Sequence, residues 1–564
     1  CEQQRVTQLL AWLLEYHRRD DKPMWWRFFE RLSKDDNELY DDPDFLAGLV
    51  RTETAPWPDK KSLVYQFRFD PEQETRLHEG SKVRIIGPEI TRAVIATMDP
   101  IAGLLTIKRG VGREMPTWCH LIPDEHVSAK PIAESIERYV RAWSEGATPS
   151  QAIDDLLHRR SPRIRGRGDD SAPLVVGDDL VSETTRIVRA MDNTVLAIQG
   201  PPGTGKTHTA AHVIAALLDD GKRIGVVANS HAVVGNLLAK VRDLASRHVD
   251  RLYKAGAEYT PDDVQCLRDS GKVIDRLDQP VVVGGTAWVF SRPELQQRLD
   301  YLFVDEAGQM SLANTIGAGM AARNLVLVGD QMQLAQVVQG VHPGESGLSC
   351  LEYFLHGHQT VPPHLGVLLN RSYRMQPDLC RFISDAYYEG RLQSDACTHN
   401  NRIDWSGPAT GVHFVPVDHE GRAQSSEEEV ERVRTLVDQL IGRPMIAGDR
   451  EGPVRLEDIL VVAPFNAQVR ALIQALPAGM RVGTVDRFQG QQAPIVIVSM
   501  SASSLDDAPR GAGFLLSPNR LNVALSRAQA LAIVVASPRL GDVRVRSVAE
   551  MRLVNGWCRI DPGR

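Results

Sequence analysis

The 564-residue sequence lacks the marks of membrane proteins and of secreted, disulfide-rich proteins. Its seven cysteines never occur at CxxC spacing, which favours reduced thiols, with a zinc or iron–sulfur site as the lesser alternative. No apolar run approaches the roughly 20 residues that span a bilayer, and the N-terminus has no signal-peptide pattern. We therefore expect a soluble cytoplasmic protein with no membrane partner.

An excess of positive charge is also missing, because 72 acidic side chains outnumber 65 lysines and arginines and leave a formal net charge of -7. This charge neither supports nor excludes a polynucleotide partner, since affinity depends on where the basic residues lie. The length predicts three or four domains, and 43% hydrophobic residues are typical of a globular protein. Because the chain begins at Cys1 and reads as helix at once, we expect it to be a piece of a longer protein.

The first 180 residues divide into three regions. Apolar residues at helical spacing up to Leu32 predict packed helices rather than an aromatic platform for bases, and we assign 1–78 to an N-terminal helical region. Short β-branched runs broken by Gly and Pro predict a small β-barrel of about five strands within 79–130. Residues 131–180 are assigned to a helical stalk and a basic linker, whose arginines at 159–167 either bind phosphates or face solvent.

Beyond residue 180, short apolar runs alternate with helical stretches. Strands that are apolar on both faces and separated by helices predict parallel sheets covered on both sides. The runs fall at 195–198, 224–227, 281–283, 302–304, 325–328, 367–369, 412–415, 459–462, 495–498 and 532–535. We predict an α/β fold with two tandem domains, 181–362 and 363–564. In the second, Ser426 and Glu429 predict a capping box that opens a helix.

A glycine-rich loop, GPPGTGKT, follows the first of these strands and precedes a helical run. The backbone amides of such a P-loop bind phosphates at a helix N-terminus. We expect Lys206 to reach the β- and γ-phosphates and Thr207 to ligate Mg²⁺. The residues predicted to bind the nucleotide here are Gly200, Pro201, Pro202, Gly203, Thr204, Gly205, Lys206, Thr207 and His208.

Two carboxylates, Asp305 and Glu306, follow the predicted strand at 302–304. This places them at the carboxyl edge of a parallel sheet, where ligands of such sheets bind. Asp305 is suited to hold Mg²⁺, and Glu306 can accept a proton from the attacking water. Such a pair can also cap a helix, and it is the combination with the P-loop that favours nucleotide hydrolysis.

Six segments occur in an order that resembles motifs I to VI of superfamily 1B helicases, the Upf-like group. They are Gly200 to Thr207, Asp305 to Gln309, Gly329 to Leu334, Tyr373 to Met375, Gly483 to Gly490 and Asn522 to Ala528. The barrel before the P-loop resembles that group's domain 1B. The stretches Gln339 to Pro343 and Tyr388 to Leu392 are similar to bacterial proteins in which such a helicase follows a RecB-like nuclease region.

The resemblance implies two RecA-like domains that hydrolyse ATP with Mg²⁺. It places arginines from the second domain, Arg374 and Arg527, against the γ-phosphate. It implies that Gln333 reports the γ-phosphate and that Gln309 and Gly490 also contact the nucleotide or its water. The expected activity is that of an ATP hydrolase and helicase, with an upstream nuclease module as a possible partner and a bacterial cytoplasm as the setting.

The resemblance also implies that single-stranded nucleic acid crosses both domains, with DNA favoured over RNA and with 5′ to 3′ movement. The residues placed on the strand are Asn229, Ser230, His231, Thr286, Pro464, Asn466 and Thr484. Their alternative role is to cap the helices that follow the strands.

The sequence departs from the family pattern at three places, and two other functions are compatible with it. Ser182 and Glu183 stand where the family often has an adenine-reading Gln, so adenine selectivity is not predicted. Ala335–Gln336 replaces Pro-Pro after motif III, and Gln491–Gln492 stands where an acidic residue is common. The alternatives are an ATP-dependent remodeller or clamp without processive unwinding, and a nucleotide-binding module with vestigial catalysis.

Overall fold

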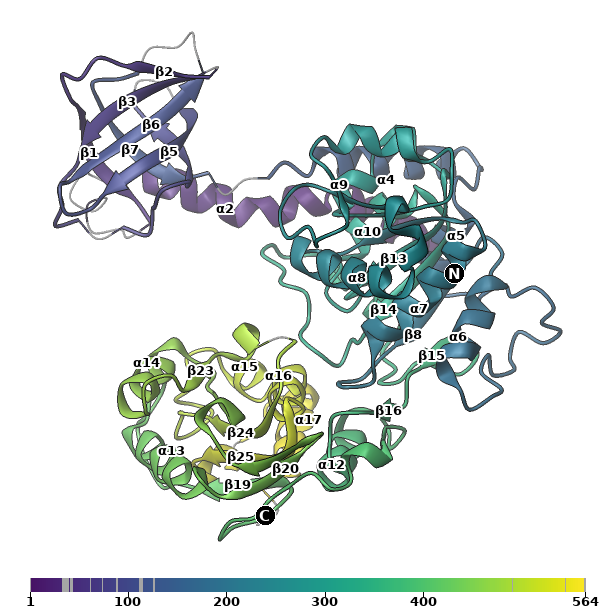
Figure 1. The fold of residues 1–564 in the computed structure, drawn as a ribbon, viewed down its shortest axis with the longest axis vertical. Helices are drawn as coiled ribbons and strands as arrows, with labels where there is room; N and C mark the ends of the chain where they lie inside the picture. The colour runs from purple at the N-terminus through teal and green to yellow at the C-terminus, as the bar shows by residue number, and fades with distance from the viewer. Residues whose placement is uncertain are drawn as a thin grey trace. The chain divides into compact units, whose positions relative to one another are not determined.

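The computed structural model describes residues 2–32, 40, 44–60, 62–73, 75–87, 90–110, 115–124, 127–488, 490–542 and 544–561. The chain divides into two units, whose elements are labelled in Figure 1. The smaller unit comprises His17–Ala129 and Gln339–Val341. The larger comprises Cys1–Tyr16, Lys130–Val338 and His342–Arg564.

A closed antiparallel barrel forms the centre of the smaller unit (Figure 1). Six described strands make the ring in the order β1-β7-β4-β5-β6-β3, which the pairing of β1 with β3 closes, and β2 extends from β3. Their bounds are β1 Leu46–Arg51, β2 Trp57–Asp59, β3 Ser62–Arg68, β4 Lys82–Ile86, β5 Thr91–Asp99, β6 Leu104–Gly110 and β7 Trp118–Pro123. Side chains of alternate residues, such as Val83 and Ile85, fill the interior.

The predicted boundaries of this region were wrong. The helices α1 (Glu2–Leu14) and α2 (Tyr16–Leu32) occupy only the first part of the segment 1–78. The barrel begins at β1 and has more than the predicted five strands. Besides their pairing with each other, β1 and β3 pair with strands far along the chain, β7 and β6. The aromatic residues of α2 divide: Phe28 is buried, whereas Trp26 is 74% exposed.

Two helices, α4 (Lys130–Ser144) and α5 (Gln151–His158), confirm the helical part of the predicted stalk. Several of the arginines that follow bind other parts of the protein, so this segment is not simply a solvated linker. Arg163 pairs with the buried Asp155 at 2.9 Å, and Arg159 Nε donates to the carbonyl of Tyr353. Arg167 donates to backbone carbonyls of its own loop.

The first sheet of the larger unit is parallel, and its described strands follow the order β11-β10-β12-β9-β13-β14-β8-β15. The strands are β8 Val195–Gln199, β9 Arg223–Val227, β10 Leu252–Ala255, β11 Gln265–Leu267, β12 Val281–Gly285, β13 Leu299–Asp305, β14 Ala322–Gly329 and β15 Gly366–Leu368. The helices are α6 Leu180–Arg189, α7 Lys206–Asp219, α8 His231–Leu244, α9 Ala287–Phe290, α10 Leu312–Gly319 and α11 Cys350–Leu355. Both faces are buried: Leu302 belongs to one core cluster and Phe303 to the other.

One strand lies in a different sheet from the one we predicted. The run at 367–369 was assigned to the second domain, but β15 pairs with β8 at the edge of the first sheet. Apolar periodicity identifies a buried strand without identifying its neighbour, and the boundary at residue 362 therefore falls too early.

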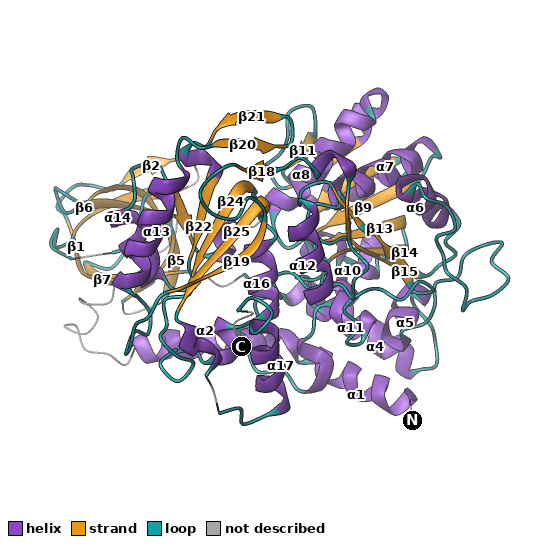
Figure 2. Cartoon of the chain, turned by 90° about the horizontal axis from the view of Figure 1, so that it is seen from below, coloured by secondary structure: helices purple, strands orange, loops and turns teal. Residues whose placement is uncertain are grey.

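The second sheet is also parallel, in the order β19-β25-β24-β22-β23. The strands are β19 Gly411–Pro416, β22 Ile459–Val462, β23 Arg481–Gly483, β24 Ala493–Ser499 and β25 Ala528–Ala536. The helices are α12 Pro377–Tyr387, α13 Glu427–Leu440, α14 Asn466–Ala475, α15 Ala512–Leu515, α16 Pro518–Leu525 and α17 Val548–Trp557. Figure 2 shows α13 and α14 on one face, and residues of α12 and α16 join the core of the other. Small pairings add β16 Arg371–Ser372, β17 Gln393–Ser394, β18 Arg402–Ile403, β20 Pro444–Ala447 and β21 Arg450–Pro453.

The predicted α/β fold, with two tandem parallel sheets after helices and a small barrel, is therefore confirmed. Within the described residues, no helix combines the length and apolarity that crossing a membrane requires. The six cysteines in this part of the chain form no disulfide.

Only half of the predicted capping box forms at the start of α13. Ser426 Oγ accepts the N–H of Glu429 at 3.1 Å, as expected. The Glu429 carboxylate does not return to the Ser426 N–H, which donates instead to Gln468 Oε1 at 2.9 Å. The carboxylate is fully buried at the end of β24, where other donors reach it.

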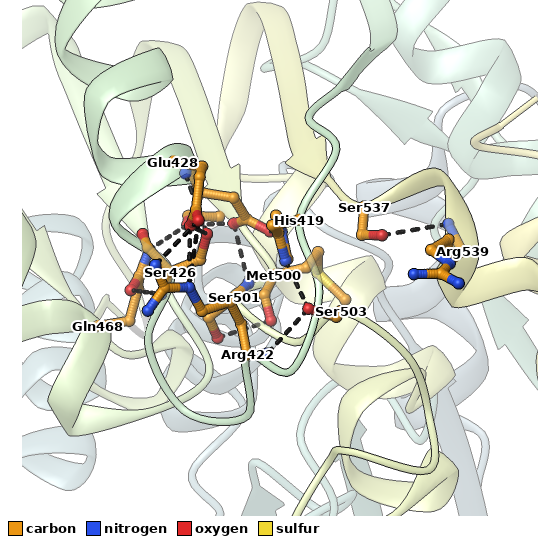
Figure 3. A network of polar contacts seen from close by, with 12 residues as sticks. His419, Arg422, Ser426, Glu428, Gln468, Met500, Ser501, Ser503, Ser537 and Arg539 are labelled. Atoms are coloured by element: carbon orange, nitrogen blue, oxygen red, sulfur yellow. Dashed lines mark hydrogen bonds and ion pairs between the residues drawn. The ribbon is translucent and has the colours of Figure 1, made fainter.

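These donors make a buried polar network, drawn in Figure 3. Glu429 accepts from Ser499 Oγ at 2.6 Å and from the Ser501 N–H at 2.9 Å. His419 Nε2 lies 3.0 Å from the same carboxylate, and its Nδ1 lies 2.7 Å from Ser503 Oγ. The network holds the loop after β24 against the N-terminus of α13.

We expect Glu429→Ala to lower the free energy of unfolding by about 3 kcal/mol, because it leaves buried donors without an acceptor. Urea unfolding followed by circular dichroism measures the change. Glu427→Ala is the matched control, since its side chain is 87% exposed on the same helical turn. Equal unfolding midpoints for the two variants would contradict a structural role for Glu429.

Candidate functional site

The P-loop connects β8 to α7 in the strand–loop–helix arrangement that the motif requires. Gly203 and Gly205 adopt left-handed φ angles of 77° and 78°, which glycine tolerates without strain. The loop packs closely on the start of the helix. A Cβ atom added to Gly200 would lie only 2.1 Å from Lys206 Cγ. Lys206 Nζ donates to the Gly200 carbonyl at 2.6 Å. The loop thus presents its amides at the start of α7, as phosphate binding needs.

The predicted Mg²⁺ ligand Thr207 and the predicted nucleotide contact His208 follow Lys206 at the start of α7. Thr207 begins the helix beside Lys206, and its hydroxyl makes no hydrogen bond to another described residue. His208 is exposed and stacks on His212, with ring centroids 4.1 Å apart. Partial desolvation and the neighbouring His212 lower the pKa of His208.

The carboxylate pair lies at the end of β13. Asp305 is 5% exposed, and its Oδ1 accepts the Glu306 N–H at 2.9 Å. Burial and the Glu306 charge raise the pKa of Asp305, while Lys206 opposes that shift. A divalent cation would stabilise the ionised pair, so Asp305 with Thr207 fits a site for nucleotide-bound Mg²⁺. Glu306 itself has a left-handed φ of 52°, a strained conformation for a residue with a side chain.

Motifs II and III pack backbone against backbone. A side chain on Gly308 would lie 2.5 Å from the Asp330 carbonyl oxygen, and one on Gly329 would lie 2.7 Å from the Ala307 nitrogen. The Ala307 N–H also donates to the Val328 carbonyl at 2.9 Å. These contacts fix Glu306 and Gln333 on adjoining loops. Gln333 Nε2 donates to Asp330 Oδ2 at 2.8 Å.

The segment that carries Arg374 lies directly on the P-loop. The Tyr373 N–H donates to the Gly203 carbonyl at 2.9 Å, and Ser372 Oγ donates to the Pro202 carbonyl at 3.1 Å. The Tyr373 ring is 58% exposed. The sequence predicted no role for this ring, although its place next to a predicted arginine finger was a signal that could have suggested one.

Arg374 and Arg527 lie close enough to repel each other. Desolvation and Arg527 lower the pKa of Arg374 to about 9, and burial lowers the pKa of Arg527. Neither forms an ion pair with a carboxylate in the described residues, and Arg527 Nε is buried without a partner there. Their positive charge would be stabilised by an anion such as a phosphate.

Neutral groups hold the two arginines. Arg374 Nε donates to Gln492 Oε1 at 2.8 Å and its NH1 to the Ser526 carbonyl at 3.0 Å, while Arg527 NH1 donates to the Gln491 carbonyl at 3.4 Å. From the sequence, Gln491–Gln492 was only a departure from the family pattern, with no predicted role. The glutamines orient the guanidinium groups without cancelling their charge. Of the same motif, Gln489 lies outside the described residues, and Gly490 is exposed with φ 79°.

Comparisons with known proteins agree with this arrangement. Family profiles described as AAA domain match residues 182–343 and 348–539. The chain is 29% identical over 372 residues to an Arabidopsis thaliana DNA replication ATP-dependent helicase/nuclease, covering 61% of this chain and 27% of that protein. It is 27% identical over 499 residues to a Drosophila melanogaster regulator of nonsense transcripts 1 homolog, covering 72% and 39%.

The chain is a homologue of the Upf-like superfamily 1 helicases. The Saccharomyces cerevisiae ATP-dependent helicase NAM7 is 26% identical over 411 residues, which cover 64% of this chain and 41% of that one. The chain thus spans between about a quarter and two fifths of these relatives. A solved arterivirus helicase, nonstructural protein 10 with DNA, covers 86% of this chain and 77% of its own, with 15% identity and a TM-score of 0.39. The predicted family resemblance is confirmed.

In this Upf-like homologue, the residues predicted to bind nucleic acid lie where strands end. Asn229 and Ser230 follow β9, Thr286 follows β12, and Asn466 and Thr484 follow β22 and β23. Asn229, Ser230 and Asn466 are exposed. Ser230 caps α8, which is the alternative role, whereas Thr286 stands at the N-cap of α9 without a side-chain cap bond. Strand contact therefore stays a prediction.

Two neighbouring residues position these predicted contacts. Lys254 is fully buried on β10 and lies 3.2 Å from His231 Nδ1, so that the ring carries its proton on Nε2 when it accepts from the ammonium. Gln468 shares the motif of Pro464 and Asn466, but it is buried and bonds to Ser426 and Ser499 (Figure 3). Gln468 anchors the motif rather than contacting a ligand. Gln309, predicted to contact nucleotide, has its carbonyl held by Asn229 Nδ2 at 2.6 Å.

We expect Gly308→Ala to reduce ATP turnover by at least about tenfold, because its side chain would force apart the loops that hold Glu306 and Gln333. Steady-state ATPase assays measure the loss, and thermal melting verifies that the variant folds. Gly168→Ala is the control, since a side chain there meets nothing within 4 Å. Normal turnover in Gly308→Ala would show that this packing does not set the catalytic geometry.

Proposed function

We propose that this chain is an ATP-driven nucleic-acid helicase or translocase, in which Mg-ATP hydrolysis drives movement along a single strand. DNA is the proposed track and 5′ to 3′ the proposed direction. Homology to ATP-dependent helicases supports the proposal, as does a P-loop followed by strand-terminal carboxylates.

The observation that carries the proposal is the Arg374 segment against the P-loop, with Arg527 near enough to lower the pKa of Arg374. The Gly203 backbone touches the Arg374 segment so closely that an added side chain would lie 2.5 Å from Arg374 Cβ. The lowered pKa of Arg374 means that its positive charge has no neighbouring negative charge to stabilise it. The γ-phosphate of ATP would supply that negative charge. The arginines belong to the segment after the first sheet, so hydrolysis responds to the relative position of the two sheets.

The remaining catalytic roles follow from the same geometry. Bound Mg²⁺ would neutralise charge on the phosphates, with Thr207 and Asp305 as its protein ligands. Glu306 accepts a proton from the attacking water, and Gln333 reports the γ-phosphate. The exposed Tyr373 ring beside the P-loop is suited to stack on the nucleotide base.

The strand would lie across the carboxyl edges of the two sheets. Exposed side chains such as Asn229, Ser230 and Asn466 offer hydrogen bonds to phosphates there, as sequence-independent binding requires. We further propose an upstream nuclease module in the full-length protein, by analogy with the helicase/nuclease relatives. A cytoplasmic setting stays a proposal from the sequence alone.

We expect Arg527→Ala to lower kcat for ATP hydrolysis by about 10³-fold, the range found for arginine fingers, while the Kd for ATP changes less than about threefold. Turnover assays and fluorescent-nucleotide binding separate the two effects. Arg434→Ala, on the surface of α13, serves as the control. A loss of ATP affinity with unchanged kcat would refute the role in hydrolysis.

The experiment that tests the proposed function is the steady-state ATPase rate with and without single-stranded DNA and RNA. We expect single strands to raise kcat at least about tenfold, because a translocase couples turnover to its track. Strand separation and directional displacement assays follow. Turnover indifferent to both polymers would refute the motor, and a stimulated rate without displacement would indicate a remodeller or clamp.

A further inference from the structure

A buried carboxylate, Asp330, joins the loop after β14 to the helices of the second domain. It is 3% exposed and accepts hydrogen bonds from four donors. Two are on its own loop: the Met332 N–H at 3.1 Å and Gln333 Nε2 at 2.8 Å. The others are Gln199 Nε2 at 3.3 Å and the Tyr388 hydroxyl at 2.7 Å.

The Tyr388 hydroxyl is the link to the second domain. Its side chain is fully buried just after α12, and its oxygen accepts from Asn522 Nδ2 at 2.8 Å. Burial and the Asp330 charge raise the pKa of Tyr388 well above its ordinary value, so the phenol stays protonated and donates to the carboxylate. The hydrogen-bond direction is thereby fixed from Asn522 through Tyr388 to Asp330.

The helix α16 binds the same loop directly. Asn522 Nδ2 donates to the Met332 carbonyl at 2.8 Å, and Asn519 Nδ2 donates to the Gln331 carbonyl at 2.7 Å. The helix ends at Leu525, two residues before Arg527. The Ser526 carbonyl between them accepts from Arg374. A continuous set of hydrogen bonds thus connects the loop of Gln333 to the two segments that carry Arg374 and Arg527.

Resting on the proposed function, we propose that Tyr388 is a positioning residue that couples Gln333 to Arg527 through Asp330 and α16. Gln333 donates one of its two amide N–H groups to Asp330. On this proposal, the side chain releases the carboxylate when it turns to a γ-phosphate. Asp330 then has one donor fewer and depends more on Tyr388, which is bonded to α16. When Gln333 leaves Asp330 for the phosphate, the hydrogen bond from Tyr388 to Asp330 tightens. This change shifts α16 and, with it, Arg527.

If Tyr388 only filled space in the core, its ring would suffice. The proposed coupling also requires its hydroxyl. The substitution Tyr388→Phe keeps the ring and removes the hydroxyl that bonds both partners. The neighbouring Tyr387→Phe is a matched control. Tyr387 is 6% exposed, and its hydroxyl makes no hydrogen bond to another residue in the described part of the chain.

The experiment measures ATP turnover of both variants in the full chain, with and without single-stranded DNA, at a temperature where circular dichroism shows each to be folded. We expect Tyr388→Phe to lower the DNA-stimulated kcat by about tenfold, the effect of one lost buried hydrogen bond to a charged group. The KM for ATP and the Kd for DNA should stay within about twofold. Tyr387→Phe should match the wild type.

A double variant then tests the coupling itself. The double variant combines Tyr388→Phe with Gln333→Ala. If Tyr388 acts through Gln333, the kcat of the double variant is little lower than the kcat of the less active single variant. Losses that multiply would overturn the proposal, and so would a Tyr388→Phe enzyme with wild-type kcat or with a defect confined to KM. Failure of DNA to stimulate the wild type would instead refute the proposed function, before any variant is compared.

Discussion

The repulsion between Arg374 and Arg527 is the constraint on which the rest of the site depends. Guanidinium groups remain charged at neutral pH, so two of them near each other, one of them the buried Arg527, raise the free energy of the folded chain. Neutral groups accept hydrogen bonds from both arginines. Gln492 and the carbonyl of Ser526 accept from Arg374, and the carbonyl of Gln491 accepts from Arg527. A carboxylate in place of Gln492 would relieve the repulsion and weaken the demand for a phosphate.

The carboxyl edges of two parallel sheets make this placement possible. Strand ends deliver the P-loop, Asp305 and the loop of Gln333 to one edge of the first sheet, and the arginine segments approach from the second. Glycines at 308 and 329 let neighbouring loops touch through their backbones, where side chains would separate them. The catalytic groups are thus fixed by backbone packing rather than by long side chains.

Local patterns predicted the parts of this structure that depend on neighbouring residues. The P-loop and most strands of both sheets were identified because their signals are continuous in sequence, whereas the short strands β10, β11 and β23 were not predicted. The strands β1 and β3 were missed, since they are stabilised by partners about 40 to 70 residues away, and β15 was placed in the wrong sheet for the same reason. Glu429 fitted a capping box by spacing, but burial directed its carboxylate to Ser499 and Ser501. The roles of Gln492 and Lys254 needed three-dimensional contacts that no spacing records.

The left-handed backbone of Glu306 has an evolutionary consequence. Glycine and asparagine adopt that conformation more easily than glutamate, so replacing this one residue by either would relieve roughly 1 kcal/mol of strain. Under the proposed role of Glu306 as proton acceptor, the site keeps a carboxylate at a cost in stability. A related chain that does not need this carboxylate would be expected to gain stability from glycine or asparagine at the same position.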